Sequence, residues 1–222
     1  MSVRSPSVPL KLYMHPMASF CWKVLIALYE NATPFEPRIV DLGNETSRDD
    51  FKRIWPIGKF PVLRDEARDR TIPESSIIIE YLAHHYPGAA ELVPRDADAA
   101  RETRLRDRFY DHYVMEPMQK IVTDKLRPAG ANDPHGVTQA KAMLETAYMM
   151  IEKDMATKTW AMGDAFTMAD CAAAPALYYA NRVLPFSSQH RHAAAYLDRL
   201  LQRPSFARVF EEAQPYMSFF PG

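Results

Sequence analysis

The fold is decided by residues 55–86, which read WPIGKFPVLRDEARDRTIPESSIIIEYLAHHY. Two short β-type runs, residues 60–64 and 70–73, flank a highly charged turn. A helical run over residues 77–86 follows at once and ends at Pro87-Gly88. Because polar residues mark turns, and because Pro and Gly end helices, this stretch predicts a hairpin that leads directly into a helix.

The residues before this stretch also show strand patterns and helix patterns in alternation. Residues 10–13 form a β-type run, and residues 19–29 carry apolar side chains at helical spacing. Residues 35–42 then alternate as a strand, and residues 47–54 can form a short helix before Pro56. The order β-α-β-α-β-β-α in fewer than 90 residues predicts a small α/β domain with a mixed sheet.

Beyond residue 95 every pattern is helical. A long charged helix over residues 96–126 is expected to bend or divide at Pro117, because proline removes a backbone donor. Thr167 and Asp170 have the spacing of a helix capping box, with Asp in place of Glu or Gln. Further helices are expected over residues 137–155, 167–184, 193–201 and 204–213.

These patterns divide the chain into two domains. We predict an α/β domain over residues 1–87, a linker over residues 88–95, and an all-α domain over residues 96–222. The split gives the fold class: α/β followed by an all-α bundle.

Composition excludes several kinds of function. The 222 residues are 47% apolar and 25% charged, which is typical of a globular protein, and the net charge of −1 gives no basic surface for nucleic acid. Only 7 glycines are present, none in a phosphate-binding loop, and the histidines lack metal-ligand spacing, so no metal is expected. Two cysteines suit a reducing compartment. With no signal-peptide or membrane-spanning pattern, the expected location is cytoplasmic, and no membrane or nucleic-acid partner is expected.

Three segments of the first domain have the chemistry of a binding site. Ser19 lies where a strand turns into a helix, so its hydroxyl can cap that helix or hold an anion in the field of the helix N-terminus. A cis Phe60-Pro61 bond would leave the Phe60 backbone free to pair with an extended ligand. Glu74 and Ser75 can receive an ammonium and a carboxylate. Together the segments describe a site for a zwitterionic, peptide-like thiol.

Four segments, in this order, resemble cytosolic glutathione transferases over essentially the whole chain. They are Ser19-x-x-x-Lys23-Val24, Gly58-Lys59-Phe60-Pro61-Val62-Leu63, Glu74-Ser75-x-x-Ile78-x-x-Tyr81-Leu82, and Gly163-Asp164-x-Phe166-Thr167-x-Ala169-Asp170. The resemblance is to serine-type members of bacterial style, similar to the theta and zeta classes. It implies a thioredoxin-like N-terminal domain, a helical C-terminal domain, glutathione as cosubstrate, a homodimer, and a role in detoxification.

The resemblance also implies a role for each matching residue. Ser19 would be catalytic and would donate a hydrogen bond to the glutathione sulfur. Glu74 and Ser75 would hold the γ-glutamyl end, and Phe60, shaped by Pro61, would pair with the cysteinyl part. Lys59 would lie near the glycyl carboxylate. The thiolate would then attack a small hydrophobic electrophile, in a pocket expected to include Met17, Tyr110 and Tyr113.

Three alternatives stay open from the sequence. Cys21, two residues after Ser19, would support a glutathione-dependent thiol–disulfide oxidoreductase if it faces the ligand, although a core position is the favoured interpretation. A maleylacetoacetate-type isomerase is the second alternative. The sequence disfavours it, because residues 18–20 read Ala-Ser-Phe where the zeta class carries Ser-Ser-Cys. The third is a non-catalytic glutathione-binding protein. The second substrate cannot be read from the sequence.

Overall fold

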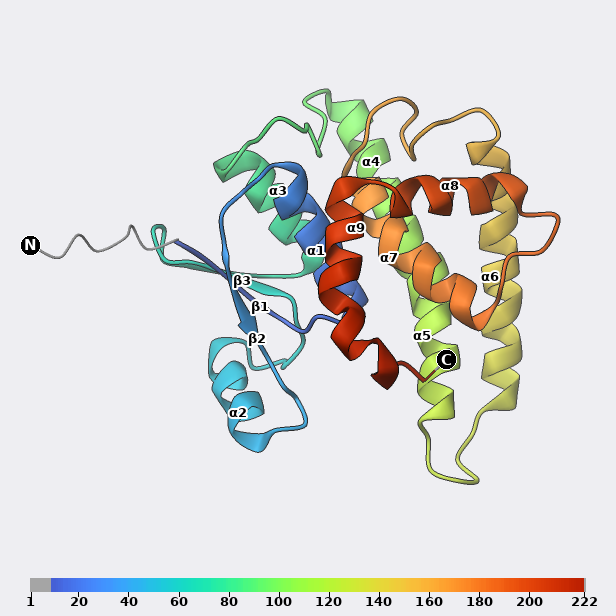
Figure 1. Ribbon diagram of the computed structural model, residues 1–222, viewed down its shortest axis with the longest axis horizontal. Coiled ribbons are helices and arrows are strands. Elements are labelled where there is room, and N and C mark those ends of the chain that lie inside the picture. Colours follow the sequence, from blue (N-terminus) through green and yellow to red (C-terminus); the bar gives the residue numbers. More distant parts are fainter. Residues whose placement is uncertain (1–8, 222) are drawn as a thin grey trace, which may run out of the picture.

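A computed structural model describes residues 9–221 of the chain (Figure 1). Residues 1–8, where we expect no signal peptide, lie outside the described part. The first half is built in the predicted order. Its elements are β1 (Leu10–Met14), α1 (Ser19–Glu30), β2 (Glu36–Ile39), α2 (Glu45–Ile54), β3 (Val62–Asp65), β4 (Arg70–Pro73) and α3 (Ser75–His85).

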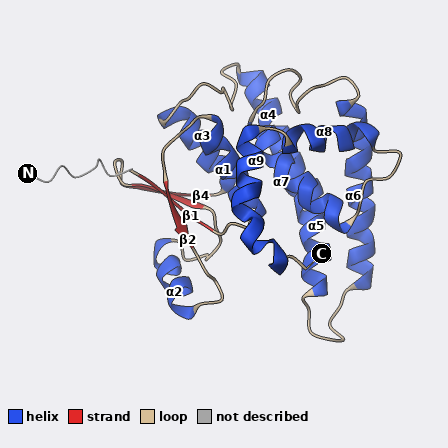
Figure 2. Ribbon diagram, in the orientation of Figure 1, coloured by secondary structure: helices blue, strands red, loops and turns tan. Residues whose placement is uncertain are grey.

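The four strands form one mixed sheet in the order β2-β1-β3-β4. β1 runs parallel to β2 and antiparallel to β3, and β3 and β4 make the hairpin expected from residues 60–73. α2 covers one face of the sheet, while α1 and α3 lie on the other face beside the helical half (Figure 2). The thioredoxin-like arrangement is thus confirmed.

Alternation along β1 explains how the sheet is packed between these layers. Leu10, Leu12 and Met14 are buried in the large core that continues into the helical half. Tyr13 points to the opposite face, where it packs against Phe51 of α2 with the ring centres 6.0 Å apart. Successive residues of a strand face opposite sides, so one short strand supports both layers.

The second half is entirely helical, as predicted. α1 packs against α7 and α9, and therefore joins the two halves through one continuous core (Figure 1). The helices are α4 (Ala97–Phe109), α5 (Glu116–Lys125), α6 (Pro134–Met155), α7 (Met168–Val183), α8 (Arg191–Leu201) and α9 (Pro204–Ala213), with a 3₁₀ turn η2 (Gln214–Phe219) at the end.

The long charged helix is divided, but the division is wider than a proline kink. A π-helical turn, η1 (Tyr110–Met115), separates α4 from α5, and Pro117 lies in the first turn of α5. The chain stays helical across this junction, since Met115 has φ of −69° and ψ of −47° and the Glu116 N–H donates to the Asp111 carbonyl five residues earlier. Because a π-helical turn contains more residues than an α-helical turn, it changes which side chains of this segment face the site.

The capping box is confirmed. The Thr167 side chain and the Asp170 side chain each accept a backbone N–H of the other residue at the start of α7. Asp170 is fully buried and also accepts from the Ala161 N–H at 2.8 Å and the Tyr196 hydroxyl at 2.6 Å. The box therefore ties α7 to the preceding loop and to α8.

Within residues 9–221, no helix has the length and apolar character needed to cross a bilayer. The predicted linker of residues 88–95 lies between the end of α3 and the start of α4, and its exact bounds stay a prediction.

Candidate active site

Ser19 is the first residue of α1, and Ala18 takes the N-cap position. Because alanine has no side-chain acceptor, the N–H groups of Ser19 and Phe20 have no partner among the described residues, whereas the Cys21 N–H donates to the Ala18 carbonyl at 2.9 Å. No acidic residue lies in that turn. The Ser19 side chain is 8% exposed and lines a hollow of about 480 Å³. Its hydroxyl forms no hydrogen bond to any residue in 9–221. The capping interpretation of Ser19 is thus wrong, and the hydroxyl is available to a ligand.

Cys21 lies in the core, as the favoured interpretation expected. The side chain is fully buried, and burial raises the pKa of its thiol to about 12, although the backbone N–H of His15 partly opposes this. A thiol of this kind is protonated at neutral pH and out of reach of a ligand. Cys171 is also fully buried.

The Phe60-Pro61 bond is cis, as predicted. Because β3 begins only at Val62, Phe60 stays outside the ladder, and its backbone groups make no hydrogen bond with the described backbone. Gly58, with φ of +68°, adopts a turn conformation that favours glycine. The Phe60 backbone donor and acceptor are therefore unused by the described backbone, and Phe60 lines the hollow.

Glu74 and Ser75 lie where β4 passes into α3. Glu74 has φ of +69°, an uncommon conformation for a residue with a side chain, and its carboxylate does not cap α3. Residues held in such conformations cost about 1–3 kcal/mol and cluster at ligand sites. Ser75 is buried at the first position of α3. Both residues line a polar hollow of about 340 Å³, together with Lys59, Phe60 and Pro61.

The two hollows adjoin, because Phe20, Lys59, Phe60 and Gln119 line both of them. One end is polar and bears Glu74, and the other contains Ser19 and a mainly apolar wall. Met17 belongs to that wall, as predicted. The wall also includes Leu42, Met118, Val122, Tyr179 and Phe220.

Tyr110 and Tyr113 do not belong to the hollow, so this part of the sequence prediction is wrong. Tyr110 is 3% exposed and lies in the core, whereas Tyr113 is 49% exposed. Both residues fall in η1, where the wider π-helical turn departs from the α-helical spacing we assumed. On this segment the wall is formed instead by Met118 and Val122, which lie one turn apart on α5, after the π-helical turn.

The sequence also failed to identify residues of the second half that line the polar hollow. These residues lie on the long charged segment, which resembles an ordinary solvated helix when only its pattern is considered. One sequence signal could have pointed to this segment: Asp107 and Asp111 lie four residues apart, on one face of the expected helix. The missed residues are Arg108, Asp111, His112, Glu116 and Gln119.

A buried ion cluster lies under the polar hollow. Lys23 of α1 is 1% exposed, and its Nζ lies 2.6 Å from Oδ1 of Asp107 and 2.8 Å from Oδ2 of Asp111. It also donates to the Ser76 Oγ at 2.8 Å. Burial raises the pKa of the Asp111 carboxyl, and the charge of Lys23 opposes that rise. The basic residue four positions after Ser19 thus joins the domains and does not reach the ligand space.

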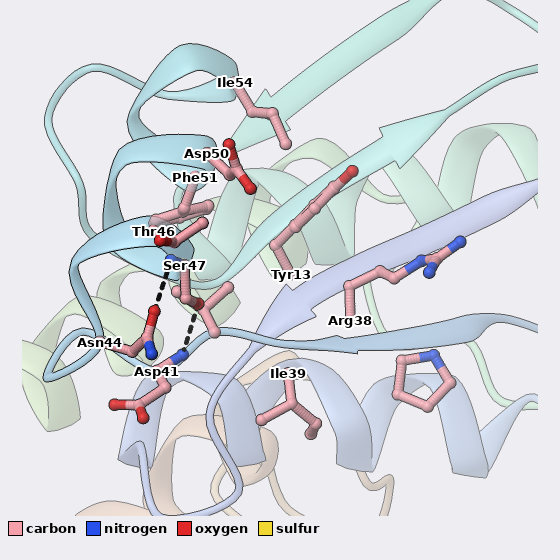
Figure 3. A pocket seen from close by; sticks show the side chains of 12 residues that line it. Tyr13, Arg38, Ile39, Asp41, Asn44, Thr46, Ser47, Asp50, Phe51 and Ile54 are labelled. Atoms are coloured by element: carbon pink, nitrogen blue, oxygen red, sulfur yellow. Dashed lines mark hydrogen bonds between the residues drawn. The ribbon is translucent and has the colours of Figure 1, made fainter.

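A larger hollow, about 690 Å³, lies elsewhere, between β2 and α2 (Figure 3). Several of its polar groups are hydrogen-bonded to one another. The Asn44 side chain accepts from the Ser47 N–H at 3.0 Å, and the Ser47 hydroxyl accepts from the Asp41 N–H at 3.0 Å. Arg38 pairs with Glu36 at 2.8 Å. We therefore place the candidate site at Ser19 and Glu74. Within residues 9–221, no group of three or more His, Cys, Asp or Glu side chains is arranged to hold a metal ion.

Comparison with known families agrees with this architecture. Residues 12–90 match the glutathione S-transferase N-terminal domain, and residues 109–204 match the glutathione S-transferase C-terminal domain. Glutathione S-transferase 3 of Zea mays is 30% identical over 208 residues, which are 90% of this chain and 93% of that protein. The chain belongs to the glutathione transferase family.

Solved structures of glutathione transferases have the same fold. The glutathione transferase URE2P8 of Phanerochaete chrysosporium, solved with oxidized glutathione, has a TM-score of 0.85 at 22% identity and covers 97% of this chain and 99% of its own. A glutathione S-transferase of Methylobacterium radiotolerans in complex with glutathione sulfonate has a TM-score of 0.78 at 26% identity, covering 90% and 93%. A probable maleylacetoacetate isomerase of Caenorhabditis elegans is 27% identical, covering 92% and 94%.

Proposed function

We propose that this glutathione transferase uses Ser19 to stabilise the glutathione thiolate for attack on a small hydrophobic electrophile. The observation that carries the proposal is the free Ser19 hydroxyl at the start of α1, in the apolar hollow that adjoins the polar hollow. A donated hydrogen bond and the helix dipole together would lower the pKa of a thiol from ~8.5 by about one or two units. Glutathione needs no metal in this scheme.

The rest of glutathione would follow the polar hollow. Glu74 would bind the ammonium and Ser75 the carboxylate of the γ-glutamyl end, because both side chains face the hollow. The unpaired backbone of Phe60, shaped by Pro61, would hold the cysteinyl part as an added strand does. Lys59, which lines both hollows, would lie near the glycyl carboxylate.

The electrophile would enter the apolar hollow beside Met17. In the reaction, the thiolate forms a carbon–sulfur bond as the leaving group departs with its electron pair, and the thiol proton has already passed to solvent. An aryl halide is a suitable probe, because Phe20, Phe60, Tyr179 and Phe220 line the hollow. Nothing in this step requires a covalent intermediate on the protein.

The assembly and cellular setting also belong to this proposal. We infer a cytoplasmic homodimer that acts in detoxification, as the family resemblance implies. Support for the dimer comes from exposed apolar side chains on neighbouring helices of the two domains, Ile77 of α3 (53% exposed) and Leu105 of α4 (58% exposed). The Arg104–Glu80 ion pair joins these helices at 2.8 Å.

The alternatives receive less support. An oxidoreductase that uses Cys21 would need a reachable thiolate, which burial of Cys21 disfavours. An isomerase would have a relative in the C. elegans protein, but residues 18–20 here read Ala-Ser-Phe. A binding protein without turnover would keep the same contacts to glutathione.

Ser19→Ala and Cys21→Ala, assayed with an aryl halide and with a mixed disulfide, separate these functions. We expect Ser19→Ala to lose more than about tenfold in aryl-halide rate, because one oriented donor is removed from the sulfur. Cys21→Ala should stay near wild type with both substrates. The opposite pattern would reject the role of Ser19, and glutathione binding without either activity would favour the binding protein.

A further inference from the structure

Arg108 brings a guanidinium from the second domain to the polar hollow. It lies in the last turn of α4 and lines the hollow together with Glu74 and Ser75, which come from the first domain. Its side chain is 43% exposed, so the group is open to a ligand. No family motif in the sequence pointed to this residue.

The guanidinium is fixed from one side only. Nε donates to Asp107 Oδ2 at 3.1 Å, and Nη2 donates to Asp107 at 2.8 Å, to Asp111 at 2.5 Å and to the Ser76 hydroxyl. Nη1 has no hydrogen-bond partner among residues 9–221. Two N–H donors therefore remain directed away from the carboxylates that hold the group.

The charges beneath Arg108 leave it able to attract an anion. Asp107 and Asp111 are shared between Arg108 and the buried Lys23, so two carboxylates are balanced by two cations. Without Lys23, the two carboxylates would outweigh the single guanidinium. Because the cluster is neutral, its own charges do not oppose a carboxylate that approaches Nη1. Glu74 also acts on Arg108 from the same hollow, and in this scheme its charge is balanced by the ammonium of the ligand.

We propose that Arg108 is a binding residue for the α-carboxylate of the γ-glutamyl end, so that the two domains recognise this end together. The inference rests on the proposed function. Ser75 would donate to one carboxylate oxygen and Arg108 Nη1 to the other, while Glu74 takes the adjacent ammonium. Arginine suits this task because its planar donors match the geometry of a carboxylate.

The test compares two ligands by titration calorimetry: glutathione, and 4-aminobutyryl-Cys-Gly, which keeps the ammonium but lacks the α-carboxylate. We expect Arg108→Ala to weaken glutathione binding by about tenfold or more, the range for a charge-assisted hydrogen bond. Binding of the analogue should change less than about twofold, since it lacks the group that Arg108 contacts. Arg101→Ala is the matched control, because it removes an exposed arginine of the same helix that pairs with Asp98.

The outcomes are distinct. If the wild-type protein does not bind glutathione, the proposed function fails before the role of Arg108 is tested. If the wild type binds and Arg108→Ala weakens both ligands equally, or neither, the role of Arg108 is rejected. If Arg108→Ala does not fold, Arg108→Lys takes its place. Lysine keeps the positive charge but lacks the planar pair of guanidinium donors. Arg108→Lys should therefore reduce the preference for glutathione over the analogue. An unchanged preference would overturn the proposal.

Discussion

At the scale of single residues, Ala18 decides what Ser19 can do. An Asp, Asn, Ser or Thr at the N-cap would accept a first-turn N–H and stabilise α1 by about 1 kcal/mol relative to alanine. Alanine gives up that stability and leaves the positive end of the helix unoccupied beside the Ser19 hydroxyl. In our account, this open end is part of the thiolate site.

Ala18→Asp should therefore raise stability and lower activity. We expect about 1 kcal/mol more stability in urea unfolding, because the N-cap backbone already has the extended conformation, with φ of −78° and ψ of 118°. The new carboxylate would also repel the thiolate, so the aryl-halide rate should fall at neutral pH. A variant with both higher stability and full activity would show that the open helix end is not used.

At the scale of elements, short motifs were predictable and distant partners were not. Ser19, the cis Phe60-Pro61 bond and the Glu74-Ser75 pair each depend on a turn between adjacent elements, and such turns have local signals in the sequence. Arg108 and Asp111 reach the same hollow through tertiary packing of α4 and η1 on α1 and α3. Tyr110 and Tyr113 were misplaced because no local signal marked the π-helical turn.

The Thr167–Asp170 capping box gives a prediction at this scale. Asp170→Ala should cost roughly 3 kcal/mol or more in the free energy of unfolding, since it removes a cap and leaves the Ala161 N–H and the Tyr196 hydroxyl unpaired in the core. Thr167→Ala, which removes only the capping hydroxyl, should cost about 1 kcal/mol. Urea unfolding of both variants checks this, and equal losses would mean that Asp170 acts only as a cap.

At the scale of the whole molecule, the candidate site depends on contact between the two halves. Lys23 of α1 is buried between Asp107 and Asp111, and α1 packs against α7 and α9. The Tyr179 hydroxyl of α7 donates to the Met17 carbonyl at 2.8 Å, which fixes the segment just before Ser19. The second half therefore positions the turn that carries Ser19 and also lines the apolar hollow.

The proposed dimer is also a matter for the whole molecule. We expect Ile77→Asp combined with Leu105→Asp to convert a homodimer into a monomer, because charges would be buried where apolar side chains meet a partner. Light scattering after size-exclusion chromatography measures the mass. Met149→Asp with Met150→Asp is the control, since these exposed α6 residues should leave the mass unchanged. A wild-type monomer, or a double variant that stays dimeric, would contradict this interface.

The most direct test of the central claim is an ultraviolet titration of the thiolate of bound glutathione, in the wild type and in Ser19→Ala. The wild-type complex should titrate about one to two units below the free-thiol pKa of ~8.5. In Ser19→Ala the pKa should return most of the way toward the free value, while glutathione still binds through Glu74 and Ser75. Equal thiol pKa values in the two complexes would show that Ser19 does not stabilise the thiolate.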